Sequence, residues 1–402
     1  MIGQTWAILV DSYRELHSKK LFWISLLISA LCVLVFAGVG INERGITLLA
    51  WTIPNPLFNT NFWTPAAYYK WVFVNFGIQL WLAWIATILA LISTAPIFPD
   101  FLAGGAVEMV ISKPIGRVRL FLTKYFAALI FVGVQVLVFC GLCMVMLGIR
   151  GGSWEPKLLL AVPLVLAFFS FLYCLCALFG VLTRSTIASL LLTFLVWLLL
   201  FAMNAGDAAM VFGREYFESR VESLERIVPR RERAAQNEAD RLKEDKLALA
   251  EGREPVTPSP RREHTQAELF AANPLLERGQ RELEESRKDL KQLRFWHGIL
   301  IKVKTPLPKT TETIELLERT ILTPQEIQRF STAVMERQRE RELQRRKIRG
   351  TSDDDSLTNA EVQAQAEQAL RSRSLWWVLG TSFAFESVVL AFACWRFARR
   401  DF

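Results

Sequence analysis

The sequence predicts an all-α polytopic membrane protein with about six transmembrane helices and a large, mostly helical extracytoplasmic insertion between the fifth and sixth spans. Two observations predict this class. The chain is 52% hydrophobic although 21% of its residues are charged. Of its 47 basic and 39 acidic residues, 32 and 31 respectively lie between positions 207 and 373. A soluble globular domain mixes apolar and charged residues more evenly, so these are separate regions of the chain.

The apolar regions form segments long enough to cross a bilayer, which takes about 20 mostly apolar residues. The first follows Lys19 and Lys20, as in a signal peptide, but it is longer than the about 7–15 residues of a signal h-region, and we interpret it as a retained span. Thr183–Thr186 predicts a tight turn between the fourth and fifth spans. The six predicted spans are 21–39, 71–97, 126–147, 158–182, 187–203 and 375–395.

Basic residues in the short flanks of the spans indicate the orientation. With the N-terminus inside, the inner flanks hold eleven Lys and Arg residues, and the short outer loops hold four. We therefore expect a multi-pass protein of the cell (inner or cytoplasmic) membrane with both termini cytoplasmic. Long loops translocate largely regardless of charge, so the charged segment is expected outside. The predicted regions are 1–203 with spans one to five, 204–374 outside, and 375–402 with the last span and a cytoplasmic tail.

The charged segment predicts helices separated by breakers. Residues 214–250 and 274–298 have helical composition, and Lys302–Thr313 contains two prolines and predicts an extended piece. Thr323, followed by Pro324 and Glu326, predicts a helix start and a helix to about 349. Apolar residues are sparse, so we expect an antiparallel hairpin or coiled-coil-like stalk without a large core. A partly disordered, solvated segment is the alternative.

Several kinds of chemistry have no support in the sequence. The charged segment is nearly neutral, so the net charge of +8 does not indicate a nucleic-acid partner. No phosphate loop is present, and we find no catalytic residues and no metal-type spacing. Asp353–Asp355 is more typical of an acidic loop than of a cation site, because no calcium-loop spacing follows. The six cysteines, which fit packing roles, all lie in apolar runs: Cys32, Cys140, Cys143, Cys174, Cys176 and Cys394.

Four polar side chains fall inside predicted spans: Asn75, Gln79, Gln135 and Glu386. Glu386 stands near the middle of the last span. A carboxylate is costly there and is a functional candidate by default. A hydrogen-bonded helix contact is the other interpretation, and the sequence leaves both open.

The connection between the second and third spans is the most informative stretch. It runs from Phe98 through FPDFLAGGAVEMVISKPIGRVRLFLTK and is too long for a tight turn. Asp100, Gly104 and Gly105 open it, a short helix 106–112 is expected next, and Lys113-Pro114 ends that helix. We call residues 98–125 the elbow, and we expect it to lie amphipathically at the inner membrane surface.

The elbow resembles that of the ABC-2 type permeases, the membrane subunits of ATP-binding-cassette exporters. In that family a run of glycine, glutamate, apolar residues, Lys/Arg-Pro, Arg and Lys joins the second and third spans. Six spans, inner termini and an amphipathic entry helix in the first twenty residues are similar to the family layout. The insertion 204–374 departs from it. The matching positions are Gly105, Glu108, Lys113, Pro114, Arg117 and Lys124.

The resemblance implies a transporter subunit that is not itself an enzyme. A separate ATPase would dock on the elbow, with Glu108 and Arg117 as contacts and Gly104 and Gly105 permitting the bend. No cofactor would be bound directly, since ATP acts through the partner. A second permease chain, identical or not, would complete the pathway. Basic side chains facing lipid headgroups are the alternative for the elbow.

The insertion leaves further roles open. The insertion would either bind a partner protein in the cell envelope or gate the external exit of the transport pathway. The competing function is a membrane-anchored structural or sensory protein that acts through its extracytoplasmic stalk.

Overall fold

The computed structural model describes residues 20–49, 51–54, 60, 63–103, 116–254, 274–321 and 359–399. These fall into two compact units. Unit one comprises 1–205, 302–337 and 371–402, and unit two comprises 206–301 and 338–370. Helix α9 (Thr186–Ala250) belongs to unit one at its start and to unit two afterwards. Residues 302–321, which the sequence assigned to the outer segment, therefore group with the spans.

Five helical stretches of the described residues are long and apolar enough to span a membrane, which confirms a helical membrane protein. The first predicted span forms the shorter apolar helix α2 (Lys20–Gly38). The second stretch is built from α3 (Pro65–Val72), η1 (Phe73–Ala86), α4 (Thr87–Thr94) and α5 (Ile97–Ala103). The five stretches are 65–102, 117–151, 156–183, 186–250 and 376–398.

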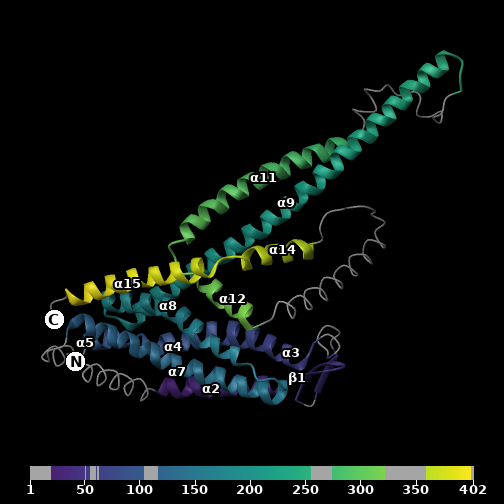
Figure 1. The fold of residues 1–402 in the computed structure, drawn as a ribbon. Coiled ribbons are helices and arrows are strands. Elements are labelled where there is room, and N and C mark those ends of the chain that lie inside the picture. The colour runs from purple at the N-terminus through teal and green to yellow at the C-terminus, as the bar shows by residue number, and fades with distance from the viewer. Residues whose placement is uncertain are drawn as a thin grey trace. The chain divides into compact units, whose positions relative to one another are not determined.

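The remaining predicted spans correspond to α7 (Arg117–Gly151), η2 (Pro156–Leu160) with α8 (Ala161–Thr183), the first part of α9, and η4 (Trp376–Gly380) with α15 (Thr381–Ala398). The predicted tight turn between the fourth and fifth spans is confirmed: Arg184, with φ 55°, ends α8 in the left-handed conformation. Figure 1 shows α2, α4, α7 and α8 packed alongside one another in unit one.

A small antiparallel sheet follows the first span and was not expected from the sequence. Strands β1 (Val39–Asn42), β2 (Gly45–Leu48) and β3 (Trp51–Pro54) pair in the order β1-β2-β3. Asn42 Oδ1 closes the first turn by accepting from the backbone N–H groups of Arg44 and Gly45, each at 2.9 Å. Strands of four residues carry too little periodic signal to be recognised.

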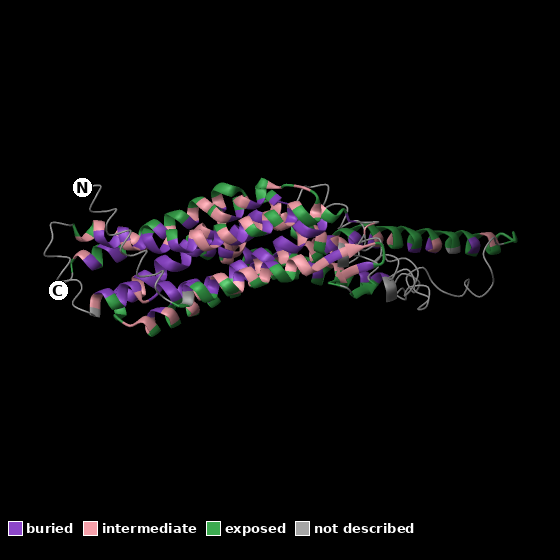
Figure 2. Cartoon of the chain, turned by 90° about the horizontal axis from the view of Figure 1, so that it is seen from below, coloured by how far each residue is buried: buried purple, intermediate pink, exposed green. Residues whose placement is uncertain are grey.

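The core of unit one is made of aromatic and aliphatic side chains from the spans. Figure 2 shows the buried residues concentrated where these helices pack. Its largest fully buried side chains include Phe121, Phe131, Phe139, Phe169 and Tyr173. Charged pairs occur at the edges, where Lys70 of α3 bonds Glu155 at 2.7 Å.

The segment 302–313 corrects one prediction. It is not an extended piece: α11 (Pro274–Lys304) continues into it, and α12 (Thr310–Ile321) begins shortly after Pro308. Apolar residues of α12 join the core of unit one, with Leu317 fully buried and Ile314 and Ile321 nearly so. The sequence placed α12 in an outer segment without a large core, whereas α12 contributes to the core of the spans. The predicted helix 323–349 lies outside the described residues.

Buried charges hold α12 against the start of the last span. Glu312 accepts hydrogen bonds from Lys304 and from Arg373, the latter at 3.0 Å. Glu318 pairs with Arg371 at 2.7 Å. The ammonium of Lys309 is fully buried and donates to the carbonyls of Thr305 and Leu307 at 2.6 and 3.0 Å. Buried charges require partners of this kind, so we call Lys304, Lys309, Glu312, Glu318, Arg371 and Arg373 the α12 charge cluster.

Stability should depend on pH through α12. Burial, with the neighbouring Glu312, raises the pKa of Glu315 to about 7 from 4.5. The folded chain therefore binds a proton at Glu315 more tightly than the unfolded chain does. The stability that this difference contributes is fully present below pH 4.5 and is lost as the pH rises through 7. Glu315→Gln should remove this dependence and stabilise the chain at pH 7.5 by about 1–3 kcal/mol, with little effect at pH 4.5. Thermal unfolding in lipid nanodiscs measures both, and an equal effect at the two pH values would contradict the assignment.

Unit two contains the predicted antiparallel hairpin, formed by α9 and α11 (Pro274–Lys304). Their ion pairs run in opposite directions along the two helices: Glu218 with Arg294 at 2.9 Å and Glu225 with Arg287 at 2.6 Å. Figure 1 shows α11 lying along α9. The short helix α14 (Asn359–Arg371) belongs to unit two as far as residue 370. These exposed pairs specify the register of the hairpin more than they stabilise it.

Candidate functional site

The two flanks of the elbow meet in unit one. Phe98 of α5 packs on Phe121 of α7, with ring centroids 4.8 Å apart. The ammonium of Lys124 lies 4.7 Å from the centroid of the Phe101 ring, a cation–π contact. The sequence places these flanks about twenty residues apart, so the elbow begins and ends at one place.

The end of the last span joins the same place. Phe397 of α15 lies 5.7 Å from Phe121 and 6.3 Å from Phe101, measured between ring centroids. Arg117 Nη1 donates to the carbonyl of Ala398 at 3.0 Å. The last carbonyls of a helix have no partner within that helix, and a cation is favourable there. We call Phe98, Phe101, Phe121 and Phe397 the elbow cluster.

The other elbow residues can be placed only in part. Asp100 is exposed on α5. The segment 104–115 lies outside the described residues, and it contains Gly104, Gly105, Glu108, Lys113 and Pro114 together with the expected helix 106–112. Phe98 and Phe101 thus precede the segment 104–115 in the chain, and Arg117 and Phe121 follow it.

Glu386 is buried between three helices. Its Oε1 accepts from the hydroxyl of Tyr125 of α7 at 2.8 Å, and its Oε2 accepts from Ser170 Oγ of α8 at 3.1 Å. Only 8% of Glu386 is exposed. Burial of a carboxyl without hydrogen-bond partners would be very costly, so these two hydroxyls stabilise Glu386 within the span.

The elbow cluster and Glu386 are adjacent in the packing. Tyr125 follows Lys124 in α7, and its ring stacks on Tyr173 at 5.2 Å. Tyr173 in turn lies 6.5 Å from Phe98. Unbroken ring contacts therefore connect the elbow cluster with the carboxyl in the last span.

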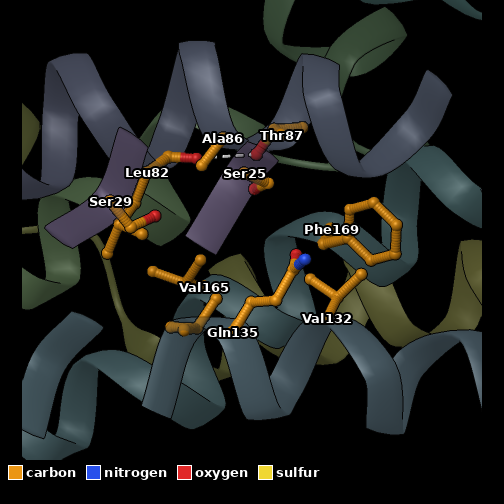
Figure 3. Close-up of a pocket in the computed structure, with 10 residues that line it drawn as sticks. Ser25, Ser29, Leu82, Ala86, Thr87, Val132, Gln135, Val165 and Phe169 are labelled. Carbon is orange, nitrogen blue, oxygen red and sulfur yellow. Dashed lines mark hydrogen bonds between the residues drawn. The ribbon is translucent and has the colours of Figure 1, made fainter. Parts of the chain in front are cut away.

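Gln135 lies at a different place, a small cavity between α2, α4, α7 and α8. The space open to water-sized spheres is about 20 Å³, enough for a water molecule. Figure 3 shows the Gln135 amide pointing into this space, near Ser25 and Thr87. Gln135 Nε2 has no hydrogen-bond partner among the described residues. A polar cavity with an unsatisfied donor is suited to a bound water.

A π-helix borders this cavity. η1 ends at Ala86, and Thr87 Oγ1 donates to the carbonyl of Leu82, five residues earlier, at 2.7 Å. Such helices are frequent at functional sites. Asn75 Nδ2 of η1 donates to the carbonyl of Trp71 in the preceding helix α3, 2.9 Å away, and Gln79 is half-buried on η1. The four polar candidates therefore do not form one site.

No family model matches the chain, and no curated protein or solved structure does so either. Within the described residues, no group of three or more His, Cys, Asp and Glu side chains is placed to hold a metal ion. Asp353–Asp355 lies outside them.

Sequence reasoning missed most partners in this site. It found Glu386 but neither Tyr125 nor Ser170, and it found Arg117 and Lys124 but none of the four phenylalanines. Tyr125 lies 261 residues from Glu386, and no local pattern relates them. The available signal was weak: Ser170 is one of few hydroxyls within an apolar run.

Proposed function

We propose that this chain is the membrane-spanning permease subunit of an ATP-binding-cassette exporter, energised by a separate ATPase that docks on the elbow. The elbow carries this proposal: its sequence resembles the ABC-2 pattern, and its flanks pack on the end of the last span. In this proposal the chain is multi-pass in the cell membrane, with both termini cytoplasmic. A second permease chain completes the pathway.

The packing supports a route for coupling. When the ATPases close on ATP, they displace the segment 104–115 and with it α5 and the start of α7. The elbow cluster and the Arg117–Ala398 hydrogen bond pass this displacement to α15. Tyr125 and Ser170 hold α15 through Glu386, so its movement changes how α7, α8 and α15 pack. Close-packed helices respond to such shifts by switching between discrete arrangements.

The proposal predicts which variants lose the ATPase. The tagged full chain, purified from its native membranes in mild detergent, should retain an ATPase that carries a phosphate loop. Glu108→Arg and Arg117→Glu should lose most of it, since each reverses a charge on the docking surface. Arg396→Glu is the matched control, because Arg396 is an exposed arginine at the same end of α15 but outside the elbow. It should retain the ATPase.

Two results would contradict the proposal. Equal retention by all three variants would exclude docking through the elbow. Wild-type chain that is folded and free of any ATPase would exclude the exporter. Transport by the reconstituted Glu108→Arg variant should fall together with its retention of the ATPase, while membrane insertion stays unchanged.

The hairpin of α9 and α11 favours a second function, that of a membrane-anchored structural or sensory protein. Its ion pairs order a long charged surface that transport does not obviously need. An envelope protein retained through residues 204–374, without an ATPase, would support this function over the exporter.

A further inference from the structure

Helix α11 has two different sides. One side packs on α9 through buried residues such as Ser286, Leu290 and His297. The opposite side carries three large apolar side chains within one turn: Phe295, Trp296 and Ile299, which are 63%, 58% and 39% exposed. In a segment otherwise rich in charge, such an apolar patch marks an interaction surface. We call these three residues the α11 patch.

Contacts within unit two fix the level of this patch along α9. His297 Nε2 lies 3.0 Å from Asp207 Oδ1, and both side chains are buried. A Cβ added at Gly213 would lie 3.0 Å from Leu293 Cδ2, so the helices approach closely here. The α11 patch is thus level with the first residues of α9 in unit two.

Those residues follow the fifth predicted span almost directly. Asp207 lies four residues after Met203, and at the helical rise of 1.5 Å per residue this is about 6 Å along α9. The headgroup layer on each side of the hydrocarbon core is about 5–8 Å thick. Because only these few residues separate the span from Asp207, the α11 patch, which is level with Asp207, must lie close to the end of the fifth predicted span.

The side chains of the patch suit that layer. Trp and other aromatic rings are enriched at membrane interfaces, because one part of the ring system is apolar and another is polar. Lys291 and Lys288 are exposed one and two turns before Phe295 on the same side of α11, and basic side chains attract anionic headgroups. On α9, Phe212 and Tyr216 are also exposed at this level, by 40% and 42%.

We propose that the α11 patch inserts into the headgroup layer of the leaflet from which α9 leaves the membrane. Lipid, rather than a protein, covers Phe295, Trp296 and Ile299. The base of the hairpin is then a membrane anchor, separate from the spans themselves.

Spin labels on the full chain test this proposal. Phe295→Cys and Trp296→Cys, each labelled with a nitroxide, are reconstituted into vesicles of phosphatidylcholine and phosphatidylglycerol. Arg281→Cys is the matched control, because it lies on the same side of α11, four turns before Phe295, and is exposed. Five of the six native cysteines are buried and Cys32 is half-buried, so the unsubstituted chain gives the background.

Oxygen concentrates in the bilayer and a nickel chelate stays in water, so the ratio of their collision rates with the label reports depth. At positions 295 and 296 this ratio should be several-fold higher than at 281. Ratios equal to the control would place the patch in water and overturn the proposal. Protection from both reagents at 295 and 296 would also overturn it, since a protein or a second copy would then cover the patch.

Discussion

Replacing Glu312 by alanine should destabilise the chain by about 3–5 kcal/mol, the cost of removing one partner from a buried ion pair. Glu312 and Lys304 are each only 5% exposed in their side chains, and Arg373 is 15% exposed. The variant would leave both cations buried without this counter-charge. Equilibrium unfolding in lipid nanodiscs measures the loss.

An exposed ion pair of the same chain provides the control. Glu282 pairs with Arg220 in the hairpin, and its side chain is 49% exposed. Glu282→Ala should cost at most about 1 kcal/mol. If both variants lose the same small amount, the α12 charge cluster does not stabilise the packing of α12 on the spans.

Tyr125→Phe should destabilise unit one by about 1–2 kcal/mol, because the variant lacks the hydroxyl that donates to Glu386. Tyr173→Phe is a closely matched control. Both rings are fully buried and stack on each other, but the Tyr173 hydroxyl has no hydrogen-bond partner among the described residues. Its removal should be neutral or stabilising, since burial of an unpaired hydroxyl is unfavourable.

The free energies of unfolding of the two variants, measured under identical conditions, separate the contribution of the Glu386 hydrogen bond from that of ring packing. An equal loss in both would mean that the Glu386 hydrogen bond contributes nothing measurable. Transport by Tyr125→Phe should fall more than transport by Tyr173→Phe if α15 moves through Glu386.

The sequence predicted the parts of the fold that local composition determines. Long apolar runs such as 126–147 require helices in a bilayer, and interleaved Glu and Arg residues indicated the hairpin. The failure at α12 has a physical cause. Pro306 and Pro308 indicated extended chain, but they precede the first turn of α12. The charges that made 302–313 look solvated find partners as far away as Arg373.

The candidate site was also predictable only in part: the sequence indicated Glu386 and the elbow but not the residues that contact them. Glu386 stood out because a carboxyl in a span is rare and costly. Its partners did not, because Tyr125 and Ser170 are unremarkable until the fold brings α7, α8 and α15 together. The elbow was found as a sequence pattern, whereas the elbow cluster depends on Phe397, almost at the far end of the chain.

The residues of the site around Glu386 are synthesised at widely separated times. Ser170 precedes Glu386 by 216 residues, and ribosomes add about 5–20 residues per second. The Ser170 hydroxyl is therefore made about 10–40 seconds before its carboxyl partner, and the Tyr125 hydroxyl, 261 residues before Glu386, is made somewhat earlier still. Throughout that interval the nascent bundle lacks α15, whose synthesis completes the packing of α7 and α8. A stop codon before residue 376 should therefore leave an open bundle that membrane quality-control proteases recognise.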